Sequence, residues 1–330
     1  MEPRVIASKK EFTLKGLFLQ WEWLLVLLMM AVFILNMNLS EYFLDYNNLR
    51  DATMGFLDKA FIVLPMVFII LMGDIDISVG SIVALSSVIM ADLYNHGVPM
   101  ELAVVICLAV GALCGWINGM LIVRFKELSS VIVTLATMII YRGIAYILLE
   151  DQASGNFPSW FKFLGWDYVG GIPFILIAFA LAVAIFAYLL HKTTFGRKVY
   201  AIGNNPMAAL YSGVRVDRIK VIVFTLAGLM AAVTALFLTS RMGSTRPNIA
   251  TGYELEVIAM VVLGGISTAG GKGRMIGAIL AVFLIGFLRY GLGLVNVSAQ
   301  SLLIILGLLL IVAVAIPQLK MRVGAGRKTT

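Results

Sequence analysis

The sequence predicts an all-α polytopic membrane protein with about ten transmembrane helices and no sizeable soluble domain. The mean hydropathy of the 330 residues is +0.99, and only 13% of them are charged. That composition supplies too little polar surface to cover a soluble protein of this size. The apolar residues also form continuous runs, which favours helices over the alternating strands of a barrel, because backbone groups in lipid must be satisfied within the structure itself.

Hydropathy divides the chain into ten candidate spans, since a helix needs about 20 apolar residues to cross a bilayer. No small-residue cleavage site follows the first apolar run, so that run is expected to be a retained span. We therefore expect an N-terminal tail over 1–16, one transmembrane domain over 17–318 and a basic tail over 319–330. The candidate spans are residues 17–38, 55–72, 77–94, 99–123, 128–149, 172–191, 219–240, 254–268, 273–293 and 300–318.

The positions of lysine and arginine indicate which side of the membrane each loop faces. With ten spans the two tails lie on the same side, and the tails and loops of that side hold 18 of the 25 basic residues. Basic residues collect in cytoplasmic loops, so both termini are expected in the cytoplasm. Membrane orientation thus explains the net charge of +7, which gives no reason to expect nucleic acid as a partner.

One long loop, over 192–218, is basic and contains a short predicted helix. Asn205 suits the N-cap, Pro206 suits the first helical position and Gly213 suits a left-handed stop. A helix this short is unstable in water alone, so its apolar side must be covered. Residue chemistry leaves open whether the cover is the protein's own spans, the lipid headgroups or a cytoplasmic partner. The apolar stripe consists of Met207, Leu210, Tyr211 and Val214.

Four segments of the sequence resemble the ribose-type permease subunits of ABC sugar importers. They occur in the order of that family and together cover about residues 60–315. The resemblance implies a type II-like importer permease fold and ten helices. The segments are "GDIDISVGS" over 73–81, "TLATMIIYRGIAYIL" over 134–148, "TTFGRKVYAIGNNPMAALYSGV" over 193–214 and "GYELEVIAMVVLGGISTAGGKGRMIGAIL" over 252–280.

The resemblance also implies partners and a role for the short loop helix. The family pairs two permease subunits, identical or related, with two cytoplasmic ATPase subunits and an external sugar-binding protein, in the bacterial inner membrane. The helix near 206–212 would be the coupling helix, which sits in a groove of the ATPase. The residues implied in coupling are Gly196, Arg197, Gly203, Asn205, Met207, Ala208, Ala209, Leu210, Tyr211 and Gly213.

Departures from the family pattern bear on the transported sugar. The second glycine of the G-G-I-D pattern is Asp74 here. The stretches "GDIDIS", "LLEDQA" and "GSTRPNIATGYELE" resemble the rhamnose-transporting branch, so rhamnose is expected ahead of ribose or another related sugar or sugar-like signal. In such systems the choice of sugar rests largely on the external binding protein, which is a separate subunit.

Two carboxylates lie between apolar runs. A charged side chain there is costly unless it is paired or lines water. Asp74 and Asp76, followed by Ser78, therefore leave two interpretations open. They have either a structural pairing role near the cytoplasmic surface or a place in the translocation path.

Further polar residues lie within or beside the candidate spans. Arg142 is expected to pair with Glu254 or Glu256, which lie at a similar depth, as a structural clamp, with contact to the sugar as the alternative. Asn118 and Asn296 are expected to hydrogen-bond another helix, with contact to a sugar as the alternative.

The sequence gives no sign of an active site, a cofactor or a metal. "GISTAGGKGR" fails the phosphate-loop pattern because Lys272 is followed by Gly273 instead of serine or threonine, so ATP hydrolysis is expected on another chain. Cys107 and Cys114 are expected to be packing residues. The alternative function is an ion-coupled secondary transporter of a small polar solute, in which Asp76 would carry the coupling ion. Such a protein has no evident use for the capped loop helix.

Overall fold

The structure of the protein is a computed structural model that describes residues 21–298, 301, 304, 305, 307, 308 and 311. Helices dominate the described part, and four very short strands form two small sheets. In chain order the elements are α2 (Trp21–Leu39), α3 (Tyr46–Phe56), α4 (Ala60–Leu71), α5 (Val79–Asn95), α6 (Met100–Arg124), α7 (Ser130–Leu149), β1 (Ser154–Gly155), η1 (Ser159–Lys162), α8 (Phe163–Trp166), β2 (Tyr168–Val169), β3 (Ile172–Pro173), α9 (Phe174–Lys192), α10 (Thr194–Asn204), α11 (Pro206–Tyr211), α12 (Val216–Met242), β4 (Ser244–Thr245), α13 (Tyr253–Leu263) and α14 (Met275–Leu294).

Six of these helices, α2, α6, α7, α9, α12 and α14, are long and apolar enough to cross a membrane. Helices α3 and α4 meet at a bend of 52° and would make a seventh span together. The expected spans 77–94 and 254–268 correspond to the shorter helices α5 and α13, of 17 and 11 residues. The expected span 55–72 is broken, because it begins at the end of α3 and continues as α4. The expected span 300–318 falls largely outside the described residues.

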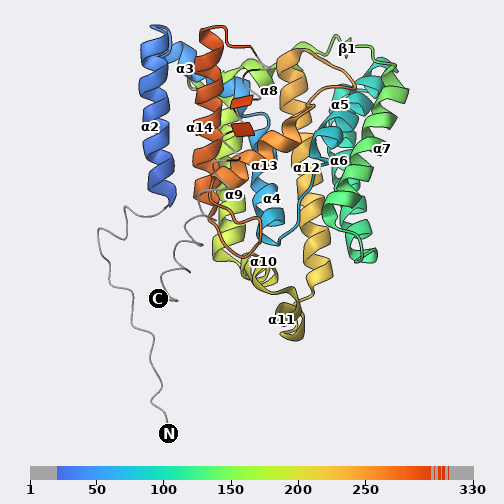
Figure 1. Cartoon of the computed structure of the whole chain (residues 1–330). Helices are drawn as coiled ribbons and strands as arrows, with labels where there is room; N and C mark the ends of the chain where they lie inside the picture. The colour runs from blue at the N-terminus through green and yellow to red at the C-terminus, as the bar shows by residue number, and fades with distance from the viewer. Residues whose placement is uncertain (1–20, 299–300, 302–303, 306, 309–310, 312–330) are drawn as a thin grey trace, which may run out of the picture.

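Helix α4 lies at the centre of the bundle (Figure 1). Every residue from Ala60 to Leu71 is buried. A helix that is apolar on all sides is buried on all sides, and α4 packs against α9, α12, α13 and α14. Its central position makes the ends of α4 contact points for several other elements.

Helices α6 and α12 approach each other through glycines. A Cβ atom on Gly228 of α12 would lie 2.1 Å from the carbonyl oxygen of Gly111 on α6, and one on Gly115 would lie 2.2 Å from the carbonyl oxygen of Phe224. Small residues allow such close packing of membrane helices. Cys107 and Cys114, also on α6, are free and buried, which confirms their expected packing role.

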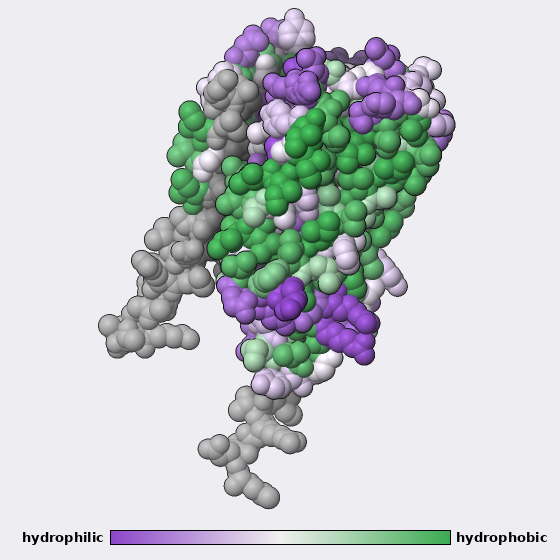
Figure 2. Space-filling model, turned by 90° about the vertical axis from the view of Figure 1, so that its right-hand side faces the viewer, coloured by the Kyte–Doolittle hydropathy of each residue, from purple (hydrophilic) through white to green (hydrophobic). Residues whose placement is uncertain are grey.

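The two ends of the bundle differ. Helices α10 and α11 lie at one end, which we call the α11 end, and the strands lie at the other (Figure 1). There β1 pairs with β4 and β2 with β3, both antiparallel, with Ser154 opposite Thr245 and Tyr168 opposite Pro173. Figure 2 shows a broad hydrophobic band between two hydrophilic ends, the surface expected of a protein that crosses a membrane.

Candidate functional site

The short helix predicted in the long loop is α11, and its caps are those expected. The side chain of Asn205 accepts a hydrogen bond of 3.0 Å from the amide of Ala208, and Pro206 occupies the first turn. Gly213, with a φ of +82°, ends the helix, and the amide of Val214 closes it by donating to the carbonyl of Ala209. The prediction of a capped helix at 206–212 is therefore confirmed.

The apolar side of α11 is exposed in the single chain. The exposed fractions are 58% for Met207, 52% for Leu210 and 84% for Tyr211, whereas Ala209 is buried and Val214 packs against the core. Of the three covers left open by the sequence, the protein's own spans do not suffice, because they leave more than half of each of these side chains exposed. A two-turn helix with such a face needs a cover from elsewhere.

Helix α10 fixes this segment to the bundle. Thr193 caps it by accepting from the amide of Gly196, which lies against the carbonyl of Leu190 and is buried. At the other end of α10, a Cβ on Gly203 would lie 1.8 Å from the carbonyl oxygen of Leu71, the last residue of α4. Any larger residue at 203 would push α10 away from α4. Arg197, on the same helix, points to solvent.

A tyrosine joins α10 to the loop before α14. The hydroxyl of Tyr200 donates to the carbonyl oxygen of Gly273 at 2.8 Å. Burial raises the pKa of the Tyr200 phenol, and the opposing effect of Arg274 is smaller. The phenol therefore stays a neutral donor over the physiological pH range, and this contact is not expected to titrate.

Residues 73–78 form a non-helical segment between α4 and α5, in which Asp74, Asp76 and Ser78 are buried. Non-helical backbone at membrane depth requires partners from the protein. Helix α7 provides them, since the amide of Ile75 donates to Ser130 Oγ at 3.1 Å and the amide of Ile77 donates to Thr134 Oγ1 at 3.2 Å. Two hydroxyl side chains at helical spacing thus stabilise the break between α4 and α5.

A buried polar network follows this segment. Asp76 Oδ1 accepts from both the amide and the hydroxyl of Ser78, at 2.8 and 2.7 Å. Asn118 of α6 donates to Ser78 Oγ at 2.7 Å, and Tyr141 of α7 donates to Asn118 Oδ1 at 3.1 Å. Asp76 Oδ2 is buried and has no hydrogen-bond partner among the described residues. The structure brings the predicted residues Asp76, Ser78 and Asn118 together and adds Tyr141 to them.

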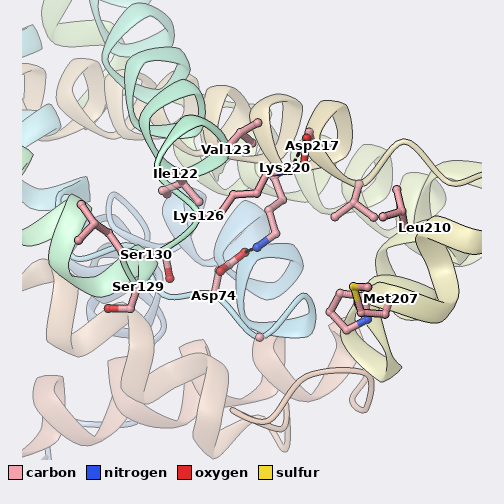
Figure 3. Close-up of a pocket in the computed structure, with 14 residues that line it drawn as sticks. Asp74, Ile122, Val123, Lys126, Ser129, Ser130, Met207, Leu210, Asp217 and Lys220 are labelled. Atoms are coloured by element: carbon pink, nitrogen blue, oxygen red, sulfur yellow. Dashed lines mark hydrogen bonds and ion pairs between the residues drawn. The ribbon is translucent and has the colours of Figure 1, made fainter.

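Asp74 lies at the edge of a cavity of about 540 Å³ beside α11. Lys220 of α12 forms an ion pair with it, with Nζ 2.7 Å from Asp74 Oδ2 (Figure 3). Pro206, Met207 and Leu210 of α11 line the same cavity. The expectation of a pairing role for Asp74 near this surface agrees with its position.

Arg142 does not pair with a glutamate, which corrects the sequence-based expectation. Its Nη1 donates to the carbonyl oxygens of Pro247 and Ile249, at 2.6 and 2.7 Å. These carbonyls belong to a non-helical stretch between β4 and α13, whose backbone needs donors at this depth. Glu254 instead accepts from the amide of Gly252, at 3.2 Å.

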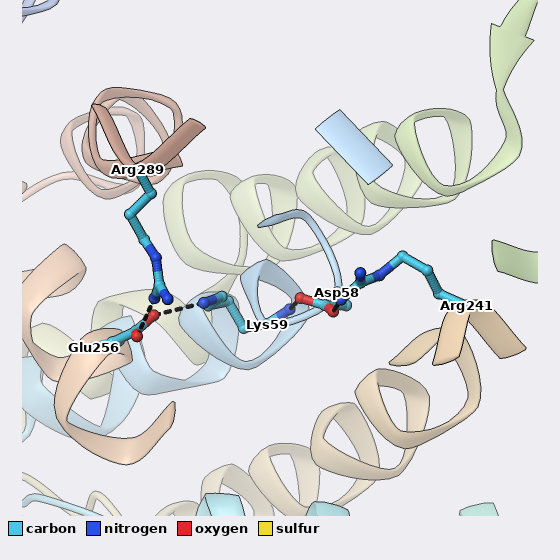
Figure 4. Close-up of polar contacts among 5 residues, drawn as sticks. All are labelled: Asp58, Lys59, Arg241, Glu256 and Arg289. Carbon is cyan, nitrogen blue, oxygen red and sulfur yellow. Dashed lines mark hydrogen bonds and ion pairs between the residues drawn. The ribbon is translucent and has the colours of Figure 1, made fainter. Parts of the chain in front are cut away.

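Glu256 belongs to a buried ionic cluster at the bend between α3 and α4 (Figure 4). It pairs with Lys59 and with Arg289 of α14. Asp58, beside Lys59 in the chain, pairs with Arg241 at the end of α12, at 2.7 Å. Only Glu256 of this cluster was a predicted site residue. Charged residues inside apolar stretches need partners, so Lys59 and Arg289 carried the signal that predicts such a cluster.

Asn296 lies close to residues that the structure does not describe, which begin at 299. It lies in the turn that follows α14, with a φ of +58°, and its side chain is exposed. The sequence places it between apolar runs, but the helix ends at Leu294 and turns there. The expected contact of Asn296 with another helix, or with a sugar, therefore stays a prediction.

These features define a class of protein. A bundle of membrane helices, with a non-helical break in its interior and a capped helix exposed at one end, has the architecture of a transport permease. The chain belongs to the family described as "Branched-chain amino acid transport system / permease component", which matches residues 53–314. It is a transport subunit and not an enzyme.

Two relatives extend over nearly the whole chain. The chain is 41% identical to the ribose import permease protein RbsC of Bacillus subtilis over 298 residues, which cover 90% of this chain and 91% of the relative. It is 36% identical to the autoinducer 2 import system permease protein LsrD of Escherichia coli K12 over 301 residues, or 89% of this chain and 91% of the relative. No solved structure matches it. The resemblance to ribose-type importer permeases is thereby confirmed.

Proposed function

We propose that this permease imports ribose, or a related sugar or sugar-like compound, across the bacterial inner membrane. The names of the two relatives support ribose and autoinducer 2 as compounds to test. They give no support to rhamnose, which the sequence resemblance placed first. Ribose is therefore the first substrate to assay.

The observation that carries the mechanism is the exposed apolar face of α11. Met207, Leu210 and Tyr211 are exposed at the polar end of the bundle, on a helix too short to be stable without cover. We infer that a separate ATPase subunit covers this face and drives transport through it. A second permease subunit and an external sugar-binding protein complete the proposed complex.

The distribution of charge supports an orientation with the α11 end in the cytoplasm. Basic residues are enriched on the cytoplasmic side of membrane proteins. In this orientation both termini are cytoplasmic and the short sheets face outward. The basic residues on α10, the start of α12 and the loops beside them are Arg197, Lys198, Arg215, Arg218, Lys220 and Lys272.

We place the solute path next to the network of Asp76, Ser78 and Asn118. The free Oδ2 of Asp76 and the break before α5 give this part of the interior uncommitted polar capacity. A sugar hydroxyl is a suitable donor to a carboxylate oxygen in such a site. Arg142 and Glu254 stabilise the neighbouring non-helical backbone and are assigned a structural role, as is Glu256.

The ion-coupled alternative is not favoured. Asp76 and the break between α4 and α5 resemble features of secondary transporters. An exposed apolar helix at the polar end has no role in a protein that works alone, and the two relatives are named as import permeases. The ATPase-driven importer accounts for both the break and the exposed helix.

Purification of the tagged permease from its native membranes in mild detergent tests the proposal. We expect an ATPase subunit in the eluate, identified by mass spectrometry. Tyr211→Asp places a charge on the docking face and is expected to remove that subunit, because a desolvated unpaired charge is costly. Tyr42→Asp is the matched control, since Tyr42 is 69% exposed outside α11. An eluate without ATPase, together with uptake driven by an ion gradient, contradicts the proposal.

A further inference from the structure

The contact between Asp74 and Lys220 joins the segment beside α11 to the interior of the bundle. Asp74 is the first non-glycine residue of the 73–78 segment, and Lys220 is in the second turn of α12. Their side chains are 11% and 21% exposed, so the pair is largely shielded from solvent. Shielded pairs are screened less by salt than exposed pairs are.

On one side, the pair is connected to the docking helix by a very short path. Only residues 212–215 separate α11 from α12, and hydrogen bonds from Val214 to Ala209 and from Val216 to Val214 close this turn. Three residues of α11 also line the cavity that Asp74 and Lys220 border (Figure 3). A displacement of α11 is therefore expected to move Lys220 as well, because the connection between them is short and hydrogen-bonded.

On the other side, the pair is connected to the buried network. Asp74 is two residues from Asp76, whose Oδ1 accepts from Ser78, the N-cap residue of α5. Ser78 is held by Asn118, and Asn118 by Tyr141. A shift of Asp74 moves the start of this chain of hydrogen bonds.

We propose that Asp74 and Lys220 are positioning residues of transport. Their ion pair transmits the displacement of α11 to the 73–78 segment and so sets the position of Asp76 and Ser78. This inference rests on the proposed function, in which an ATPase moves α11. It adds the polar contact through which that movement reaches the interior.

The chain offers a matched control on the same cavity. Lys126 Nζ lies 2.9 Å from Asp217 Oδ2, so this pair has similar geometry and also joins α12 to a neighbouring segment. Its side chains are 66% and 52% exposed, however, and exposed pairs contribute little. Neutralising Lys126 tests the loss of a lysine without the loss of the proposed contact.

The test compares Asp74→Asn, Lys220→Gln, the exchange variant D74K/K220D and the control Lys126→Gln in the full complex from native membranes. Hydrogen exchange of the peptide over 70–79 is measured with and without trapping by ATP and vanadate. We expect trapping to change this exchange in the wild type and in Lys126→Gln. We expect the change to be lost in both single variants and regained in the exchange variant, at equal amounts of protein in the membrane.

Uptake of labelled ribose is measured in parallel. The single variants are expected to lose about tenfold in rate while the ATPase still co-purifies, and the exchange variant to recover to within about twofold of the wild type. The inference is overturned if the single variants show the same trapping-dependent change in hydrogen exchange and the same uptake as the wild type. It is also overturned if D74K/K220D is as defective as the single variants. Absence of the ATPase from the wild-type eluate overturns the proposed function as well. If the wild type only fails to take up ribose, the choice of sugar is wrong but the inference is not, because the hydrogen-exchange measurement requires no sugar.

Discussion

At the scale of single residues, Asp58 and Lys59 show how one bend connects several helices. They are neighbours in the chain, yet Asp58 pairs with α12 and Lys59 pairs with Glu256 of α13. The Nζ of Lys59 also lies 4.6 Å from the centre of the Tyr253 ring. Burial makes each charge dependent on its partners, because the cost of removing it from water is offset only by the contacts it makes.

We predict that Glu256→Gln destabilises the protein. The substitution keeps the shape of the side chain but leaves Lys59 and Arg289 without their shared carboxylate, and breaking a buried pair costs about 3 kcal/mol or more. The midpoint of thermal unfolding in detergent measures the effect. Asp217→Asn, in the exposed pair with Lys126, should shift the midpoint little, and equal shifts in the two variants would refute the role of the cluster.

At the scale of elements, the contact of α6 with α12 depends on glycines that leave no room for a side chain. We predict that Gly228→Ala lowers the stability of the bundle by about 2 kcal/mol, the cost typical of overpacking, because its Cβ would overlap the carbonyl oxygen of Gly111. Gly143→Ala, in the helical interior of α7 with no atom within 4 Å of the added Cβ, is the matched control. It should unfold at the same temperature or higher, since alanine favours a helix more than glycine does.

The helices show which parts of the fold could be predicted from sequence. Long apolar runs predict α6, α7, α9, α12 and α14 to within a few residues, because hydropathy and length decide a span. The caps of α11 are also predictable, because they depend on the local residues Asn205, Pro206 and Gly213. The break between α3 and α4 coincides with the long-range ion pairs of Asp58 and Lys59, which no local pattern records.

In the candidate site, the sequence indicates which polar residues matter but not all of their partners. Asp74, Asp76, Ser78 and Asn118 stand out as polar residues near apolar runs, and each makes a buried polar contact. Arg142 was assigned the wrong partner because charge complementarity favours a carboxylate, whereas the irregular backbone before α13 offers two carbonyls. Long-range partners of this kind follow from the tertiary arrangement alone.

At the scale of the whole molecule, orientation connects the structure to the mechanism. The docking face of α11 and the pair of Asp74 and Lys220 border one cavity, and the basic residues of α10 and the start of α12 are beside them in the chain. If the α11 end faces the cytoplasm, an ATPase has access to all three. If it faces outward, no ATP-driven mechanism through α11 is possible.

Cysteine labelling with a membrane-impermeant maleimide tests the orientation. We predict that Ala208→Cys reacts only in inside-out vesicles and that Lys162→Cys, exposed at the opposite end, reacts only in right-side-out vesicles. The native Cys107 and Cys114 are buried in α6, so the wild-type protein should give little background in either preparation. The two positions lie at opposite ends of one bundle, so their reactivities should be complementary. Labelling of Ala208→Cys from the outside would remove the proposed docking site and, with it, the coupling role of Asp74 and Lys220.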